Sequence, residues 1–253
     1  MADPACPKCG GSGWRIQERN GISGAERCGC GGAGRIVDLQ ASSNIPINYR
    51  NSNFDNFVLP RDNPTARTAL SHVMVTVKSY AREFPATEKP GLLLVGEPGT
   101  GKTHLAVAAL RELIAKGFEG QFFDYQNLLE KIKAGYDPSS GSSSREAYRA
   151  ALDAEVLLLD DLGAHRITDW VEDTITAIIT YRCNNKRPLI ATTNLPDPDA
   201  GSKILERDSL SGRTGARITL AERIGMRGRS RLFEMCRVIL MPQVEDYRVR
   251  RAR

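Results

Sequence analysis

The chain has 253 residues, of which 41% are hydrophobic and 26% charged, with a formal net charge of +5 and an isoelectric point near 8.9. These totals are typical of an ordinary globular protein. No apolar run is long enough to span a bilayer, which excludes a helical membrane protein. The first residues lack a basic segment followed by an apolar core, so we expect no secretory signal, a cytoplasmic location and reduced thiols.

Four of the six cysteines lie within the first thirty residues, with the spacing C-x₂-C-x₁₈-C-x-C; they are Cys6, Cys9, Cys28 and Cys30. In a reducing compartment, two close thiol pairs separated by a loop suit Zn²⁺, because four thiolates close a tetrahedral site. Neighbouring glycines permit the tight turns that such a site needs. We therefore predict a zinc-binding module over residues 1–40, with a Cys- and Gly-rich tail of no fixed structure as the alternative.

The next segment, residues 41–63, is rich in Ser, Asn and Pro and is typical of a linker or a wrapping segment. Its interleaved aromatic residues, Tyr49, Phe54 and Phe57, indicate that it packs against something. Apolar residues at helical spacing then predict a helix over residues 65–84. We place the main domain at residues 64–253.

A phosphate-binding motif follows the apolar run at residues 92–95 and precedes a helix-like stretch at residues 105–115. It has the pattern G-x-x-x-x-G-K-[ST] and consists of Gly96, Glu97, Pro98, Gly99, Thr100, Gly101, Lys102 and Thr103, followed by His104. A strand before the loop and a helix after it are the context that the motif needs. Successive backbone amides and the positive helix N-terminus attract phosphate.

The residue types in this loop predict how a nucleoside triphosphate binds. Lys102 reaches the β- and γ-phosphates, and the Thr103 hydroxyl coordinates Mg²⁺. A second apolar run, residues 156–159, ends in Asp160 and Asp161. Because ligands of parallel sheets lie beyond the carboxyl ends of the strands, Asp160 is placed to hold Mg²⁺ and Asp161 to orient or deprotonate the attacking water. An acidic loop after a core strand is the structural alternative.

Short apolar runs alternate with helical patterns along the rest of the chain. Predicted strands lie at residues 92–95, 121–123, 156–160, 189–193 and 238–241. Capping boxes formed by Asp169 with Glu172 and by Thr219 with Glu222 predict two helix starts, and residues 196–215 read as a polar loop. The alternation predicts an α/β fold with a parallel five-stranded sheet.

The motifs in this order resemble a known family. The resemblance rests on residues 96–106, 157–164, 191–194, 229–232 and 246–248, and it extends from about residue 45 to 248. The chain resembles the AAA+ helicase loaders of the DnaI and DnaC type, and also their relative IstB. The resemblance implies an AAA+ P-loop NTPase with a reduced lid, because only roughly sixty residues follow Asn194.

The resemblance also assigns roles that the residues alone do not. Asn194 matches the sensor-1 residue, Arg231 the arginine finger that completes a neighbouring subunit's site, and Arg248 the sensor-2 arginine. Asp161 stands where most AAA+ proteins have Glu, so we expect ATP hydrolysis that is slow. The implied cofactors are ATP and Mg²⁺.

The preferred function is therefore ATP-dependent loading of a DnaB-type replicative helicase hexamer, with single-stranded DNA bound and the chain assembled as a nucleotide-dependent homo-oligomer. Candidate DNA contacts are Lys131, Lys133, Arg145 and Arg149. One alternative is an IstB-like transposition helper that binds duplex DNA and recruits a transposase. A zinc-dependent nucleic-acid-binding protein with a regulatory nucleotide site is another.

Overall fold

A computed structural model describes residues 6–12, 14–19, 22–27, 29–134, 143–202, 205–207 and 214–251. Its centre is a five-stranded parallel sheet in the order β4-β5-β6-β3-β9, which confirms the predicted sheet. The strands are β3 (Gly91–Val95), β4 (Gly120–Asp124), β5 (Val156–Asp160), β6 (Leu189–Thr193) and β9 (Cys236–Leu240). The predicted strands all lie within one or two residues of these bounds.

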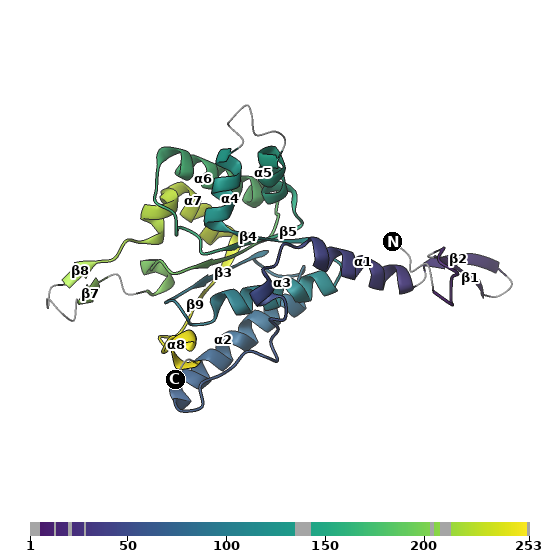
Figure 1. Ribbon diagram of the computed structural model, residues 1–253, viewed down its shortest axis with the longest axis horizontal. Helices are drawn as coiled ribbons and strands as arrows, with labels where there is room; N and C mark the ends of the chain where they lie inside the picture. The colour runs from purple at the N-terminus through teal and green to yellow at the C-terminus, as the bar shows by residue number, and fades with distance from the viewer. Residues whose placement is uncertain are drawn as a thin grey trace.

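Helices cover both faces of the sheet (Figure 1). On one face lie α2 (Pro64–Glu83) and α3 (Lys102–Ala115). The other face is covered by α4 (Tyr125–Ala134), α5 (Ser143–Asp153), α6 (Asp169–Asn184) and α7 (Leu220–Met235). Each layer has its own buried apolar cluster against the sheet.

The central strand β3 shows why its sequence is apolar throughout. Leu92 and Leu94 pack into the cluster under α2 and α3, whereas Leu93 and Val95 pack into the cluster under α4–α7. All four side chains are fully buried. Because alternate residues of a strand face opposite sides, a strand covered on both sides has no polar positions.

Two antiparallel hairpins lie at opposite ends of the molecule in Figure 1. One consists of β1 (Trp14–Arg19) and β2 (Ile22–Arg27), and it precedes α1 (Gly29–Ser42). The other, β7 (Leu205–Arg207) with β8 (Thr214–Ala216), lies within the predicted loop at residues 196–215, as does the short helix η2 (Pro198–Ala200). The strands β7 and β8 have three residues each, too few to show an apolar alternation in the sequence.

The helix starts test the predicted capping boxes. The box formed by Thr219 and Glu222 at the start of α7 is confirmed, with both reciprocal hydrogen bonds present. At α6 the prediction was wrong by one residue, because the N-cap is Thr168, whose Oγ1 accepts from the Val171 amide at 3.3 Å. Asp169 is instead the first helical residue, where a carboxylate stabilises the positive end of the helix dipole.

The predicted zinc module is not supported. The first cysteine pair does form a tight turn, in which the Gly10 amide donates to the Cys6 carbonyl at 2.9 Å. Cys28, however, lies outside the described residues, and Cys30 belongs to α1, which begins at Gly29 where a second tight turn was expected. Within the described ranges, no group of three or more His, Cys, Asp and Glu side chains is close enough to hold a metal ion.

A short helix, α8 (Tyr247–Arg251), ends the described chain and lies near α2 in Figure 1. No helix in the described part of the chain has both the length and the apolar character needed to cross a membrane.

Candidate nucleotide-binding site

A cavity of about 680 Å³ lies at the carboxyl ends of the central strands. It is lined by residues 99–104, at the end of the β3–α3 loop and in the first turn of α3, and by Asp160, Asp161 and Asn194 at the ends of β5 and β6. Residues of the segment 48–60 and of the segment 244–248 complete its walls. The parallel sheet thus brings together side chains that are far apart in the sequence, as predicted.

The backbone of the loop is shaped to approach a ligand closely. Gly99 has a φ of 73° and Gly101 a φ of 92°, in the left-handed region that glycine adopts without strain. A Cβ atom at position 101 would lie 2.6 Å from Cε2 of Phe57. Gly101 is also the N-cap of α3. The backbone amides of the first helical turn, which have no partner within the helix, therefore lie at the cavity and suit a phosphate group.

Lys102 is a buried cation, and among the described residues it forms no ion pair with an acidic side chain. Its side chain is 5% exposed, and Nζ donates to the neutral carbonyl of Glu97 at 2.7 Å. Burial lowers the pKa of Lys102 to about 8, and the charges of Asp161 and Asp160 only partly oppose this shift. A phosphate group fits here, because it would supply the negative charge that the buried ammonium lacks.

Asp160 lies beside the predicted magnesium ligand Thr103. The Asp160 carboxylate is buried and accepts a hydrogen bond from Thr192 Oγ1 at 2.6 Å. Burial raises the pKa of Asp160, while hydrogen bonds with Thr192 and Thr103 oppose the rise. A hydroxyl and a carboxylate in contact are the hard oxygen ligands that Mg²⁺ prefers, so these residues fit the ion.

Asp161, which follows β5, is held by hydrogen bonds with Thr192 and Asn194. Its φ is 55°, an uncommon value for a non-glycine residue. The Asp161 amide donates to Thr192 Oγ1 at 3.0 Å, and Asn194 Nδ2 donates to Asp161 Oδ1 at 2.8 Å. The Thr192 hydroxyl therefore joins both acids, and Asn194 fixes the direction of the second.

The structure adds a wall that sequence reasoning missed, formed by the segment that we interpreted as a linker or wrapping segment. Arg111 of α3 donates to the Ser52 carbonyl at 2.9 Å. His104 Nε2 lies 2.9 Å from the Asn53 carbonyl, and the Phe57 ring meets the His104 ring edge-on at 5.4 Å. The predicted packing of this segment is thus confirmed. The helix against which it packs is α3.

The same segment is also attached to the sheet at its beginning. The Phe122 amide of β4 donates to the Ser43 carbonyl at 2.8 Å, and Asn44 Nδ2 donates to Gln121 Oε1 at 2.8 Å. The signal in the sequence was the set of aromatic residues among asparagines. The composition of the segment did not indicate which helix these aromatic residues pack against.

The C-terminal residues close the cavity from the opposite side. The Tyr247 amide donates to the Gly99 carbonyl at 3.1 Å, and the Arg248 side chain lines the cavity. The positive charge of Arg248 contributes to lowering the pKa of Lys102, so the two cations face the same space. The sensor-2 role that the resemblance implies for Arg248 stays a prediction, and the residue lines the cavity.

Some predicted site residues lie elsewhere. Gly96, Glu97 and Pro98 do not line the cavity. The Glu97 carboxylate instead forms a two-pronged ion pair with Arg217, a contact that spans 120 residues. Arg231 lies on α7, where it pairs with Glu234 at 2.7 Å and is 45% exposed. Arg231 therefore does not line the cavity of its own chain.

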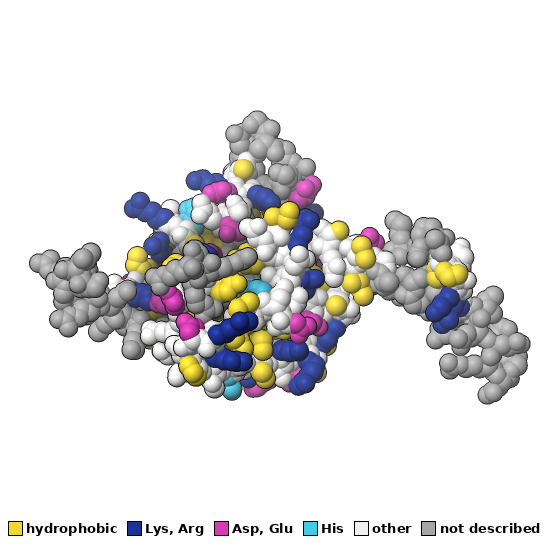
Figure 2. Space-filling model, turned by 60° about the horizontal axis from the view of Figure 1, so that its bottom comes forward, with side chains coloured by type: hydrophobic (Ala, Val, Ile, Leu, Met, Phe, Trp, Pro, Cys, Tyr) yellow, Lys and Arg dark blue, Asp and Glu magenta, His cyan; other side chains and the backbone are white. Residues whose placement is uncertain are grey.

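The candidate DNA contacts Lys131, Lys133, Arg145 and Arg149 are all exposed. On the face shown in Figure 2, Lys and Arg side chains are interspersed with acidic and apolar ones over the described part. The charges on this face therefore do not by themselves mark a nucleic-acid path.

Comparison with known proteins finds a matching family and several similar proteins. Residues 76–210 match the sequence model of a family described as IstB-like ATP binding protein. The protein YqaM of Bacillus subtilis (strain 168) is 29% identical over 79% of this chain and 67% of its own length. The replicative helicase loader DnaC of Buchnera aphidicola is 26% identical over 63% of this chain and 62% of its own length.

The fold comparison agrees with the sequence matches. The crystal structure of a DnaC helicase loader has a TM-score of 0.60 and 32% identity, covering 78% of this chain and 100% of that chain.

Proposed function

Because this chain belongs to the family of IstB-like ATP binding proteins, we propose that it is an ATP-dependent loader of a DnaB-type replicative DNA helicase hexamer. The observation that carries the proposal is the 32% identity to a DnaC helicase loader across the whole of that chain. The family has the ATP-binding AAA+ fold, and the cavity at the end of β3 provides the residues for its chemistry.

The proposed reaction is hydrolysis of ATP to ADP and phosphate. Lys102 and the loop amides would bind the phosphates, Thr103 and Asp160 would hold Mg²⁺, and Arg248 of α8 would contact the same phosphates. Asp161 accepts the proton of the attacking water, and the amide of Asn194 keeps that carboxylate in place. Bound Mg²⁺ would neutralise charge on the transferring phosphoryl group.

The proposed assembly is a nucleotide-dependent homo-oligomer in the cytoplasm. Arg231 projects from α7 outside its own cavity, so it would act in the site of the adjacent subunit. A planar guanidinium is suited to the charge that spreads over a transferring phosphoryl group. Single-stranded DNA and the helicase hexamer would bind to this oligomer.

A co-purification experiment tests the loading function. The full chain is mixed with the DnaB-type helicase of its host, with ATP, with ADP or without nucleotide, and separated by size. We expect a complex with the parent chain in ATP and a weaker one with Lys102→Ala, which loses the phosphate contact. Absence of a complex with the parent chain under all three conditions would contradict loading.

The second candidate is an IstB-like transposition helper, which the name of the matching family favours. The two functions differ in the DNA that they require. We expect ATP-dependent binding to single-stranded oligonucleotides to exceed binding to duplexes of equal length. The opposite preference, with a protected duplex footprint in ATP, would favour the transposition helper.

A further inference from the structure

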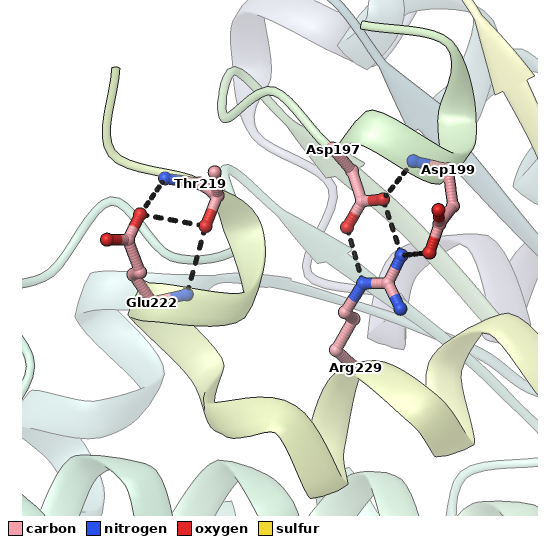
Figure 3. Close-up of polar contacts among 5 residues, drawn as sticks. All are labelled: Asp197, Asp199, Thr219, Glu222 and Arg229. Atoms are coloured by element: carbon pink, nitrogen blue, oxygen red, sulfur yellow. Dashed lines mark hydrogen bonds and ion pairs between the residues drawn. The ribbon is translucent and has the colours of Figure 1, made fainter. Parts of the chain in front are cut away.

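A buried ion pair joins the end of β6 to α7 (Figure 3). Arg229 donates to both oxygens of Asp197, from Nε to Oδ2 at 2.6 Å and from a terminal nitrogen to Oδ1 at 2.6 Å. The side chain of Asp197 is 0% exposed and that of Arg229 is 14% exposed. Two parallel charge-assisted hydrogen bonds fix both distance and orientation.

Two further contacts restrict the guanidinium of Arg229 to one orientation. It also donates to Oδ2 of Asp199 at 2.5 Å, and it lies over the ring of Phe233 at 4.3 Å. The hydrogen bond with Asp197 raises the pKa of Arg229 above its ordinary value. Since a buried ion pair often adds little to stability compared with apolar residues of the same size, its best-supported use is to specify one arrangement of the elements it joins.

A break in α7 divides the helix into two segments, and the position of the second segment relative to the sheet has to be fixed. The helix is interrupted at Gly225, which has a φ of 75° and a ψ of 152°. The capping box of Thr219 and the hydrogen bond from the Leu220 amide to the Pro196 carbonyl anchor only the turn before this break. The segment after the break carries Arg231. Buried Leu232 and Met235 pack it against the core, and Lys89 Nζ donates to the Phe233 carbonyl at 2.7 Å. The ion pair of Arg229 is the contact that ties this segment to the residues after β6.

The two ends of the ion pair lie close to residues of the proposed site. Asp197 follows Asn194 by three residues, and Asn194 contacts Asp161. Arg231 follows Arg229 by two residues, so on a helix the two side chains project to nearly opposite sides, about 200° apart. With Arg229 directed at Asp197, Arg231 is directed outward, where it is 45% exposed.

We propose that the Asp197–Arg229 pair is a positioning device, which couples the strand end beside the hydrolytic acids of one subunit to the presentation of Arg231 to the next subunit. This inference rests on the proposed function, because it requires Arg231 to act in trans. A change at Asn194 would reach Arg231 through three residues of backbone, one ion pair and half a helical turn.

A mixing experiment with full-length subunits tests whether the pair positions Arg231 for the next subunit. The acceptor is Arg231→Ala, which keeps its nucleotide site, and the donor is Lys102→Ala, which keeps Arg231. Mixing them should restore ATP hydrolysis. A donor that also carries Asp197→Asn with Arg229→Gln should restore at least tenfold less, although it binds the acceptor equally well by size-exclusion chromatography in ATP. The double substitution leaves no unpaired buried charge, so the donor keeps its fold.

The matched control is a donor with Asp199→Asn, because Asp199 contacts the same guanidinium but is 74% exposed. It should restore hydrolysis as well as the parent donor. Full restoration by the donor with Asp197→Asn and Arg229→Gln would overturn the positioning role while leaving the trans site intact. If the parent donor itself restores nothing, the proposed trans site fails and the coupling fails with it.

Discussion

At the scale of single residues, a few hydrogen bonds fix the positions of the two acids in the cavity. Thr192 donates to Asp160 and accepts from the Asp161 amide, so one hydroxyl sets the separation of two acids that have different proposed tasks. Asp161 keeps its left-handed backbone because Thr192 and Asn194 bind it. Backbone strain of this kind persists only where surrounding contacts maintain it.

The lowered pKa of Lys102 gives a pH dependence to nucleotide binding. With a pKa of about 8 in the free protein, Lys102 is charged at pH 7 and mostly neutral at pH 9. Binding at the higher pH must then include uptake of a proton, so we expect the Kd for ATP to rise by about tenfold between pH 7 and pH 9. Titration calorimetry measures the change.

Lys102→Met is the control for this pH dependence, since it removes the titrating group. Its affinity for ATP should be lower at every pH and nearly constant from pH 7 to pH 9. A parent Kd that does not change over this range would show that Lys102 is not the group in question.

The residues of the phosphate loop and the two acids were predictable because each group follows a recognisable apolar run, whereas the role of Asn194 came from the resemblance. The parallel sheet then brings these ends together. Contacts such as His104 with Asn53 and Glu97 with Arg217 were not predictable, since they join residues 51 and 120 positions apart without a local pattern. Asp197 was hidden for the same reason, in a segment that read as a polar loop.

At the scale of elements, α3 connects the phosphate loop to the segment before α2. Its first turn supplies the loop amides, and further along it Arg111 holds the Ser52 carbonyl. The ring of Phe57 fills the space beside Gly101. Nucleotide binding and the packing of this segment should therefore be linked.

Phe57→Ala tests this linkage. Because an edge-to-face aromatic pair contributes about 0.5–1.5 kcal/mol, we expect weakening of ATP binding by up to about tenfold. The matched control is Ile47→Ala, since Ile47 lies in the same segment, is 76% exposed and does not line the cavity. Fluorescence titration with a labelled ATP analogue compares the two, and equal affinities would contradict the linkage.

At the scale of the whole molecule, the arrangement separates the site from the residue that we propose to act in trans. The cavity lies at the carboxyl ends of the strands, whereas Arg231 lies on α7 outside its lining. The sheet order was not predictable beyond the rule that alternating strands and helices form parallel sheets. That β3 lies between β6 and β9 is a product of tertiary packing.

Arg231→Ala should lower kcat for ATP hydrolysis on the order of a thousandfold, as expected for an arginine finger. The Kd for ATP should stay unchanged, because Arg231 does not line its own cavity. The control is Arg227→Ala, an exposed arginine of the same helix. Steady-state rates over a range of protein concentrations measure both, and equal loss in the two variants would contradict a specific role for Arg231.

The attachment of Ser43 to β4 has a practical consequence for shortened versions of this protein. A fragment that starts at residue 64 keeps the sheet but removes one wall of the cavity and uncovers Leu70, which is 4% exposed in the intact chain. Fragments for crystallisation or for nucleotide assays should therefore begin before residue 43. A protease cut between residues 43 and 60 should likewise release bound nucleotide before the sheet itself unfolds.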